Sequence, residues 1–117
     1  MQIGAQFYTL REFCQTPEDL ALSLRKVADI GYKTVQISGT CPYDAHWLKT
    51  ELDKNGLKCV ITHTPPVRLQ EETVAVCQEH KIFGAECVGL GGFVFQRAEM
   101  PGQYAQFVET YLPVAKT

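Results

Sequence analysis

The chain repeats a short pattern of polar and apolar positions three times. Each copy begins with a glycine, at Gly31, Gly56 and Gly84, and continues with Lys or Glu two residues later and Val four residues later. The copies lie 25 and 28 residues apart. Each reads as a helix stop followed by a short apolar strand, and helical spacing of apolar residues fills the intervals. A period of this size predicts repeated units of one strand and one helix.

The pattern predicts strands at about residues 2–8, 33–37, 59–63 and 86–90, and helices at about residues 17–30, 45–54, 69–83 and 100–115. Thr16 and Asp44 are the expected N-caps, and the three glycines are expected to end helices. In the third helix, Val74 and Cys77 are expected to face the core and His80 to face solvent. Four short strands separated by helices imply one parallel sheet with right-handed crossovers.

Alternate strand positions divide into two sets. One set is mostly branched and apolar: Val35, Ile37, Val60, Thr62, Val88 and Leu90. The other set is smaller and more polar, and it includes Gln36, Cys59 and His63. A doubly wound open sheet is apolar on both faces, whereas a (β/α) barrel has one helix-facing set and one interior set. The pattern therefore favours an α/β fold of the barrel type; the alternative is a small open parallel sheet, flavodoxin-like.

Residues 1–117 contain no linker-like stretch, so we expect a single domain of four βα units. A complete (β/α)₈ barrel of the TIM type needs roughly 250 residues, so this chain is expected to form the first, N-terminal half of one. Four strands cannot close a barrel, which leaves the interior face and two strand edges open. The expected partner is therefore a missing C-terminal half or further copies of the chain in a homo-oligomer.

Composition and charge narrow the function classes. The net charge is −2 and basic residues occur singly, so neither nucleic acid nor an anionic membrane surface is an expected partner. The 5 cysteines are an odd number and include no CxxC pair. This usage predicts reduced thiols and a cytoplasmic location. No apolar run is long enough to span a bilayer.

His63 is the strongest candidate for a catalytic or binding residue. It follows a predicted strand and precedes two prolines, at the carboxyl end where barrel enzymes place catalytic and binding groups. The alternative is a histidine that only bonds a neighbouring loop. Earlier strands carry uncharged polar residues at equivalent positions: Gln36, Ser38, Gln6 and Tyr8. Such groups suit a polyhydroxy ligand; the alternative is that they only fill the barrel interior. Gly91 either admits a ligand to the backbone or makes a tight strand exit. No carboxylate stands at the upper interior ends of strands two to four, so His63 alone cannot hold a metal.

Three segments resemble the sugar phosphate isomerase/epimerase family of xylose-isomerase-like TIM barrels. They are residues 3–11 (IGAQFYTLR), 31–39 (GYKTVQISG) and 56–65 (GLKCVITHTP). The resemblance covers the whole chain but only the first half of such a barrel. A nucleic-acid enzyme of the related AP-endonuclease type is disfavoured, because no basic patch is present.

The resemblance implies a fold, a reaction and a site. In that family Mn²⁺, Mg²⁺ or Zn²⁺ is held by Glu, Asp and His residues of later strands and polarises a small carbohydrate or sugar phosphate while carboxylates move the proton. None of those ligands has a counterpart here. What carries over is the substrate-facing rim of Tyr8, Gln36, His63 and Gly91, with His63 as the catalytic candidate. The alternative function is a catalytically inactive half-barrel that binds a partner or associates with itself.

Overall fold

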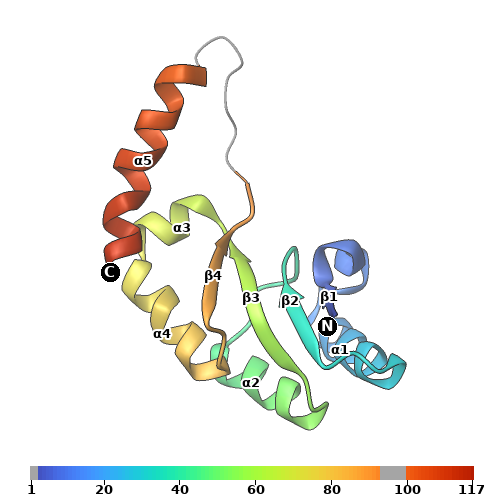
Figure 1. Cartoon of the computed structure of the whole chain (residues 1–117). Coiled ribbons are helices and arrows are strands. Elements are labelled where there is room, and N and C mark those ends of the chain that lie inside the picture. The colour runs from blue at the N-terminus through green and yellow to red at the C-terminus, as the bar shows by residue number, and fades with distance from the viewer. Residues whose placement is uncertain (1–2, 93–99) are drawn as a thin grey trace.

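A computed structural model describes residues 3–92 and 100–117 (Figure 1). Strands and helices alternate along it: β1 (Gly4–Gln6), the 3₁₀ helix η1 (Phe7–Phe13), α1 (Pro17–Ile30), β2 (Thr34–Ile37), α2 (Ala45–Lys54), β3 (Lys58–Thr64), α3 (Pro66–Glu71), α4 (Thr73–Phe83), β4 (Cys87–Leu90) and α5 (Met100–Lys116). None of the described helices is both long and apolar enough to cross a bilayer.

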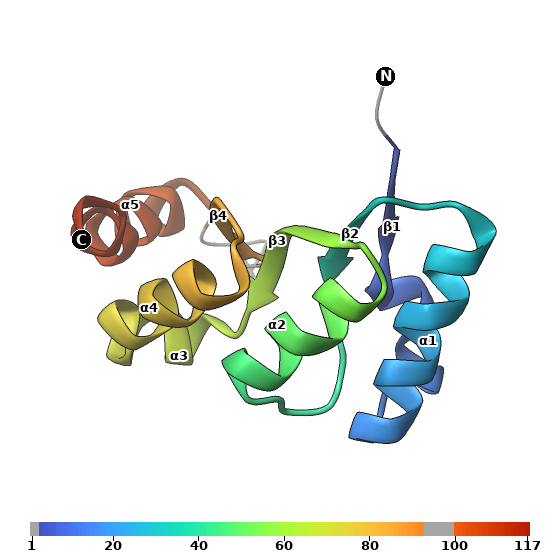
Figure 2. The same cartoon turned by 90° about the horizontal axis from the view of Figure 1, so that it is seen from below.

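The four strands form one parallel sheet in the sequential order β1-β2-β3-β4. The predicted α/β class and the parallel sheet are therefore confirmed. Helices α1, α2 and α4 lie along one face of the sheet, and α5 lies beside α4 at the β4 end (Figure 2). No helix of the described residues covers the other face, which we call the open face.

The core lies between the sheet and the helices on its covered face. Phe7, Leu20, Leu24, Val35 and Leu48 are fully buried there. A smaller cluster of Leu69, Val76 and Tyr111 joins α3, α4 and α5 below β4. Because apolar burial is confined to one face, the side chains at the carboxyl ends of the strands remain accessible from the other.

The predicted helix ends are confirmed by their hydrogen bonds and dihedral angles. The Thr16 hydroxyl accepts a bond from the Asp19 amide at 3.1 Å, and the Asp44 carboxylate accepts bonds from two amides at 2.9 and 3.0 Å. Gly31 and Gly84 take positive φ values of 114° and 78°, which residues with a Cβ avoid. Each N-cap contributes about 1 kcal/mol to stability. By fixing where the helices begin and end, the caps and the glycines also fix the positions of the loops that carry the site.

The predicted division of strand positions is wrong at the start of β3. Val35 pairs with Cys59 but Gln36 pairs with Ile61, so Val60 is an extra residue in a β-bulge. Cys59 therefore faces the helices and is fully buried, whereas Val60 is 36% exposed. Burial raises the pKa of the Cys59 thiol to about 11. Beyond the bulge the predicted division is right again, with Thr62 buried.

The first strand is shorter than predicted and ends at Gln6, where the chain turns into η1. Side chains stabilise this turn by bonding back to carbonyl groups. The Thr9 hydroxyl donates to the Gln6 carbonyl at 2.7 Å, and Arg11 Nη1 donates to the Tyr8 carbonyl at 2.9 Å. Tyr8 therefore lies on a helical turn just after β1 and not on the strand.

The predicted third helix is two helices, and its core face was misassigned. The chain breaks at Glu72, between α3 and α4. The buried residues of α4 include Val76 and His80, whereas Val74 is 58% exposed. His80 is buried because both of its ring nitrogens have partners: Nδ1 bonds the Val76 carbonyl and Nε2 bonds the Thr62 hydroxyl, each at 2.7 Å.

Candidate functional site

The imidazole of His63 is held by two side chains from β2 and the loop that follows it. Its Nδ1 lies 3.0 Å from the Ser38 hydroxyl oxygen, and its Nε2 lies 2.5 Å from the Gln36 amide nitrogen. An amide nitrogen can only donate, so with the Gln36 amide in this orientation Nε2 of His63 accepts, and Nδ1 is left to donate to the Ser38 hydroxyl. These contacts arise because parallel strands bring their carboxyl ends to one edge of the sheet.

Two glycines of β4 and the segment after it make room for the ring. A Cβ atom at Gly91 would lie 2.9 Å from His63 Nδ1 and 3.0 Å from Cγ. At Gly89 it would lie 2.5 Å from the Thr62 carbonyl oxygen and 3.1 Å from His63 Cδ2. Any larger residue would displace the imidazole or the neighbouring strand. The absence of a side chain at Gly91 therefore allows the His63 ring to pack against the backbone just after β4.

A hollow of about 430 Å³ opens beside His63 at the carboxyl edge of the sheet. We call it the edge hollow. It is lined mainly by uncharged polar groups, glycines and prolines: Gln6, Tyr8, Ser38, His63, Thr64, Pro65, Pro66, Gly91 and Gly92. Of the predicted site residues, Tyr8, His63 and Gly91 thus line one hollow, and Gln36 holds the ring of His63. The structure therefore brings these four residues together at one edge of the sheet, with Tyr8 reaching it from η1 and not from β1.

Tyr8 reaches the edge hollow from η1. Its side chain is 52% exposed, and the Arg11 guanidinium lies 4.7 Å from the centre of its ring. The ring also packs on Gly39, where φ is 69° and an added Cβ would lie 3.0 Å from Tyr8 Cδ2. The phenol is therefore positioned by a cation–π contact and by the turn after β2.

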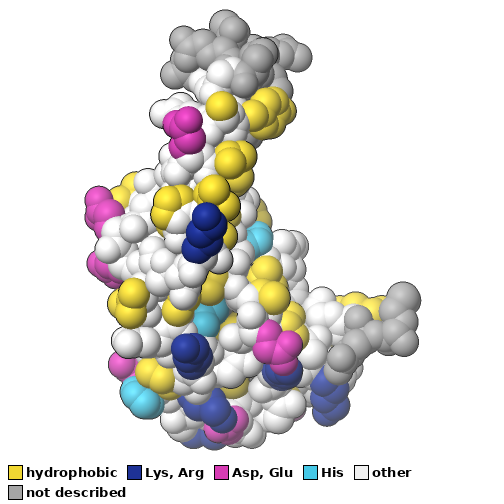
Figure 3. Space-filling view, turned by 60° about the vertical axis from the view of Figure 1, so that its left-hand side comes forward, with side chains coloured by type: hydrophobic (Ala, Val, Ile, Leu, Met, Phe, Trp, Pro, Cys, Tyr) yellow, Lys and Arg dark blue, Asp and Glu magenta, His cyan; other side chains and the backbone are white. Residues whose placement is uncertain are grey.

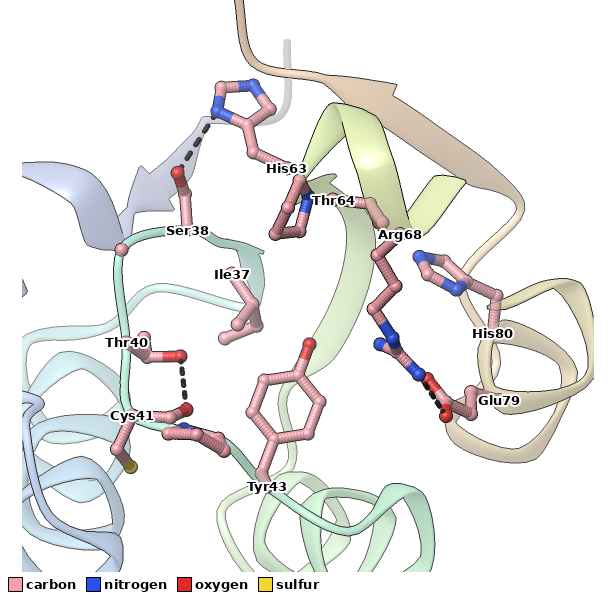
Figure 4. A pocket seen from close by; sticks show the side chains of 13 residues that line it. Ile37, Ser38, Thr40, Cys41, Tyr43, His63, Thr64, Arg68, Glu79 and His80 are labelled. Carbon is pink, nitrogen blue, oxygen red and sulfur yellow. Dashed lines mark hydrogen bonds and ion pairs between the residues drawn. The ribbon is translucent and has the colours of Figure 1, made fainter. Parts of the chain in front are cut away.

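A second hollow, of about 500 Å³, lies between the segment 38–43 and helices α3 and α4 (Figure 4). We call it the Tyr43 hollow. Its charged lining residues, Arg68 and Glu79, form an ion pair with Nη2 and Oε1 2.5 Å apart. Arg68 also bonds Glu72 through Nε at 3.1 Å. Residues 63–65 and Ser38 line both hollows, so the two share a wall.

The Tyr43 hollow was missed by reasoning from the sequence. Its polar residues lie on a loop and on two helices whose break and core face were predicted wrongly. The one readable signal is the spacing of Arg68 and Glu72, which are four residues apart and form a typical helical ion pair. The partnership of Arg68 with Glu79 depends on how α3 packs against α4, and no local pattern encodes it.

Burial lowers the pKa of the His80 imidazole, although the bond to the Val76 carbonyl and the nearby Glu79 charge act in the opposite direction. His80 is therefore an uncharged hydrogen-bonding group in the wall of the Tyr43 hollow. Burial likewise raises the pKa of the Tyr43 phenol. Both groups keep their neutral forms near pH 7, so the charge of this hollow is set by Arg68 and the carboxylates around it.

No three His, Cys, Asp or Glu side chains come together as metal ligands within residues 3–92 and 100–117. The described residues therefore do not provide a ligand set for the divalent metal that the family resemblance implies. Comparison of the sequence with protein-family models and with curated proteins found no match. The resemblance consequently remains a hypothesis.

We expect Gly91→Ala to displace the His63 ring and to break its bonds to Gln36 and Ser38. The matched control is Gly92→Ala, because a Cβ at Gly92 meets no described atom within 4 Å. Gly91→Ala should lower the free energy of unfolding by about 1 kcal/mol, as overpacking does, and should change the imidazole ¹⁵N shifts. Identical shifts and stabilities for the two variants would contradict the proposed packing.

His80 should make stability depend on pH. Its folded-state pKa lies below the ordinary value of 6.5, so the unfolded state binds the proton first on acidification. Its contribution to stability is therefore complete above that value and is lost as the pH falls below it. In urea titrations at about pH 7.5 and about pH 5.5, His80→Gln should lose less stability on acidification than the wild type. The control, His46→Gln at an exposed position, should lose as much as the wild type. Equal losses in all three proteins would refute the assignment.

Proposed function

We propose that the chain is the N-terminal half of a (β/α)₈ barrel, and that the complete barrel is a sugar or sugar phosphate isomerase or epimerase. The sequential strand order supports the half-barrel, because doubly wound sheets reverse their order at a switch point. The one-sided placement of α1, α2 and α4 supports it too, since a doubly wound sheet carries helices on both faces (Figure 2).

The observation that carries the functional proposal is the setting of His63. Its ring is oriented by two neutral partners and borders a hollow whose polar groups are uncharged. Neutral donors and acceptors suit the hydroxyls of a carbohydrate. An imidazole can accept and return a proton near neutral pH, which isomerisation and epimerisation both require. Proton uptake at Nε2 requires the Gln36 amide to turn, so that its oxygen accepts the new N–H.

The role assigned to this chain is therefore the sugar-facing wall and one proton-transfer group. The divalent metal (Mn²⁺, Mg²⁺ or Zn²⁺) that the resemblance implies would polarise the sugar, and its ligands would have to come from the later strands of the complete barrel. The substrate contacts we assign to this half are Tyr8, Gln36, His63 and the backbone at Gly91. Gln36 acts through His63 in the structure, so its contact with substrate depends on the turn just described.

We expect His63→Gln to lower kcat/KM of the complete barrel by roughly 100-fold or more, the usual effect of losing a general acid–base group. His46→Gln, at an exposed position of α2, is the control and should leave kcat/KM unchanged. The assay is aldose–ketose interconversion together with exchange of solvent deuterium into the sugar. If His63→Gln turns over and exchanges like the wild type, His63 has only a structural role.

An inactive half-barrel that binds a partner or itself is the second candidate. Within the described residues, β1 and β4 each pair with one strand only, so each leaves one edge free for a further strand. An apolar stripe is also exposed along α5 (Figure 3), where Tyr104, Val108 and Leu112 are 53, 54 and 49% exposed. Open edges and an apolar stripe are typical of association surfaces.

The solution mass of the 117-residue chain separates these candidates. A self-association module should give a homogeneous dimer of twice 13.1 kDa by light scattering. The N-terminal half of a larger barrel should instead give heterogeneous aggregates, because its edges lack their specific partners. A monodisperse monomer would contradict both and would favour a self-sufficient open sheet.

A further inference from the structure

The Tyr43 hollow is a cavity with several polar lining groups, and the proposed proton transfer at His63 does not use it. Its volume of about 500 Å³ lies in the range typical of small-molecule sites. One wall is the segment 38–43 after β2, and the opposite wall carries Arg68, Glu79 and His80 of α3 and α4 (Figure 4). Two helices therefore hold the polar groups of one wall, and the loop after β2 forms the other.

Tyr43 presents a hydrogen-bond donor to this hollow. Its ring packs against the core and meets Phe83 edge to face, with ring centres 6.3 Å apart. Its hydroxyl points into the cavity (Figure 4), and no described residue forms a hydrogen bond with it. Because burial raises the pKa of this phenol, the hydroxyl keeps its proton at neutral pH. A rigid donor aimed into a cavity without a protein partner is free for a ligand.

Arg68 and Glu79 provide the complementary groups on the opposite wall. The guanidinium of Arg68 has five N–H groups, of which the structure assigns one to Glu79 and one to Glu72. The Glu79 carboxylate retains acceptor capacity on its second oxygen. Donors and an acceptor thus lie across the cavity from the Tyr43 hydroxyl. This arrangement suits a ligand with hydroxyl groups, because a hydroxyl group can both donate and accept a hydrogen bond.

The charges around Arg68 disfavour anions. Its single guanidinium is shared by Glu79, which lines the hollow, and by Glu72, which lies outside the lining, so these three side chains together carry a net charge of −1. A phosphate or carboxylate ligand would meet one compensated cation and an excess negative charge. A neutral ligand meets no such repulsion and can bond both members of the ion pair.

We propose that the Tyr43 hollow binds an uncharged polyhydroxy compound, which accepts a hydrogen bond from Tyr43 and donates one to Glu79. Because this hollow shares a wall with the edge hollow, the bound compound would border His63. If it is part of the substrate, an extension that rests on the proposed function, the part held here is not the phosphorylated one. The binding preference itself does not depend on catalysis.

The test is a titration of the ¹⁵N-labelled chain with myo-inositol, a rigid uncharged polyol, and separately with inorganic phosphate. Myo-inositol should shift amides of the segment 38–43 and of α3 and α4, and phosphate should leave them in place. Tyr43→Phe removes only the hydroxyl and should weaken myo-inositol binding roughly fivefold, the effect of one neutral hydrogen bond. Tyr32→Phe is the matched control and should bind like the wild type, because Tyr32 follows α1 at the other end of β2.

A charge variant provides a second readout. Glu79→Gln removes one of the two carboxylates that share Arg68, so it should weaken myo-inositol binding and allow phosphate to shift the same amides. Absence of myo-inositol binding, equal affinity in Tyr43→Phe, or phosphate binding to the wild type at this hollow would each overturn the proposal. The titration measures binding and not turnover. A negative titration would therefore not contradict the catalytic role of His63, and evidence that His63 is not catalytic would not contradict binding at the Tyr43 hollow.

Discussion

One extra residue in β3 determines which side chains face the helices and which face the open side of the sheet. Cys59 is buried against the helices, and in a regular strand Ile61 and His63 would share its face. The bulge at Val60 reverses this alternation, so that Thr62 enters the core and His63 faces the open side. The contacts of His63 with β2 and the partnership of Thr62 with His80 both depend on that single insertion.

The two hollows are therefore linked by the end of β3. His63 and Thr64 of β3, with Pro65 after it, form part of the wall of each, and Ser38 contributes to both from the loop after β2. A shift of this strand end would change the setting of His63 on one side and the shape of the Tyr43 hollow on the other. Thr62 anchors the strand end to α4 through a buried hydrogen bond to His80, which limits such a shift.

Local signals in the sequence predicted the parts of the fold that depend on local physics. Thr16, Asp44 and the three glycines mark helix ends because capping bonds and positive φ values involve only neighbouring residues. The proximity of Gln36, Ser38 and His63 was also predictable, since neighbouring parallel strands have their carboxyl ends at the same edge of the sheet. The alternation at Cys59 and Val60 was not, because a bulge in β3 is defined by its register with β2.

The errors on α4 have a similar cause. Val74 and Cys77 have the apolar character of a core face, but the chain breaks at Glu72 and α4 turns Val76 and His80 inward. A buried histidine reads as a polar surface residue unless both of its partners are known, and Thr62 is 18 residues away. Such pairs in the tertiary structure also create the Tyr43 hollow, so a second polar site beside His63 emerged only from the packed chain.

The uneven burial of the cysteines gives the molecule a natural attachment point for spectroscopic probes. Cys87 is exposed at the start of β4, whereas Cys14, Cys41 and Cys59 are buried and Cys77 is half-buried. Burial raises the thiol pKa of the three buried residues, which leaves little reactive thiolate at neutral pH. A fluorophore or spin label directed to Cys87 would lie on the outermost strand, where it would sense whatever chain comes to pair with that edge.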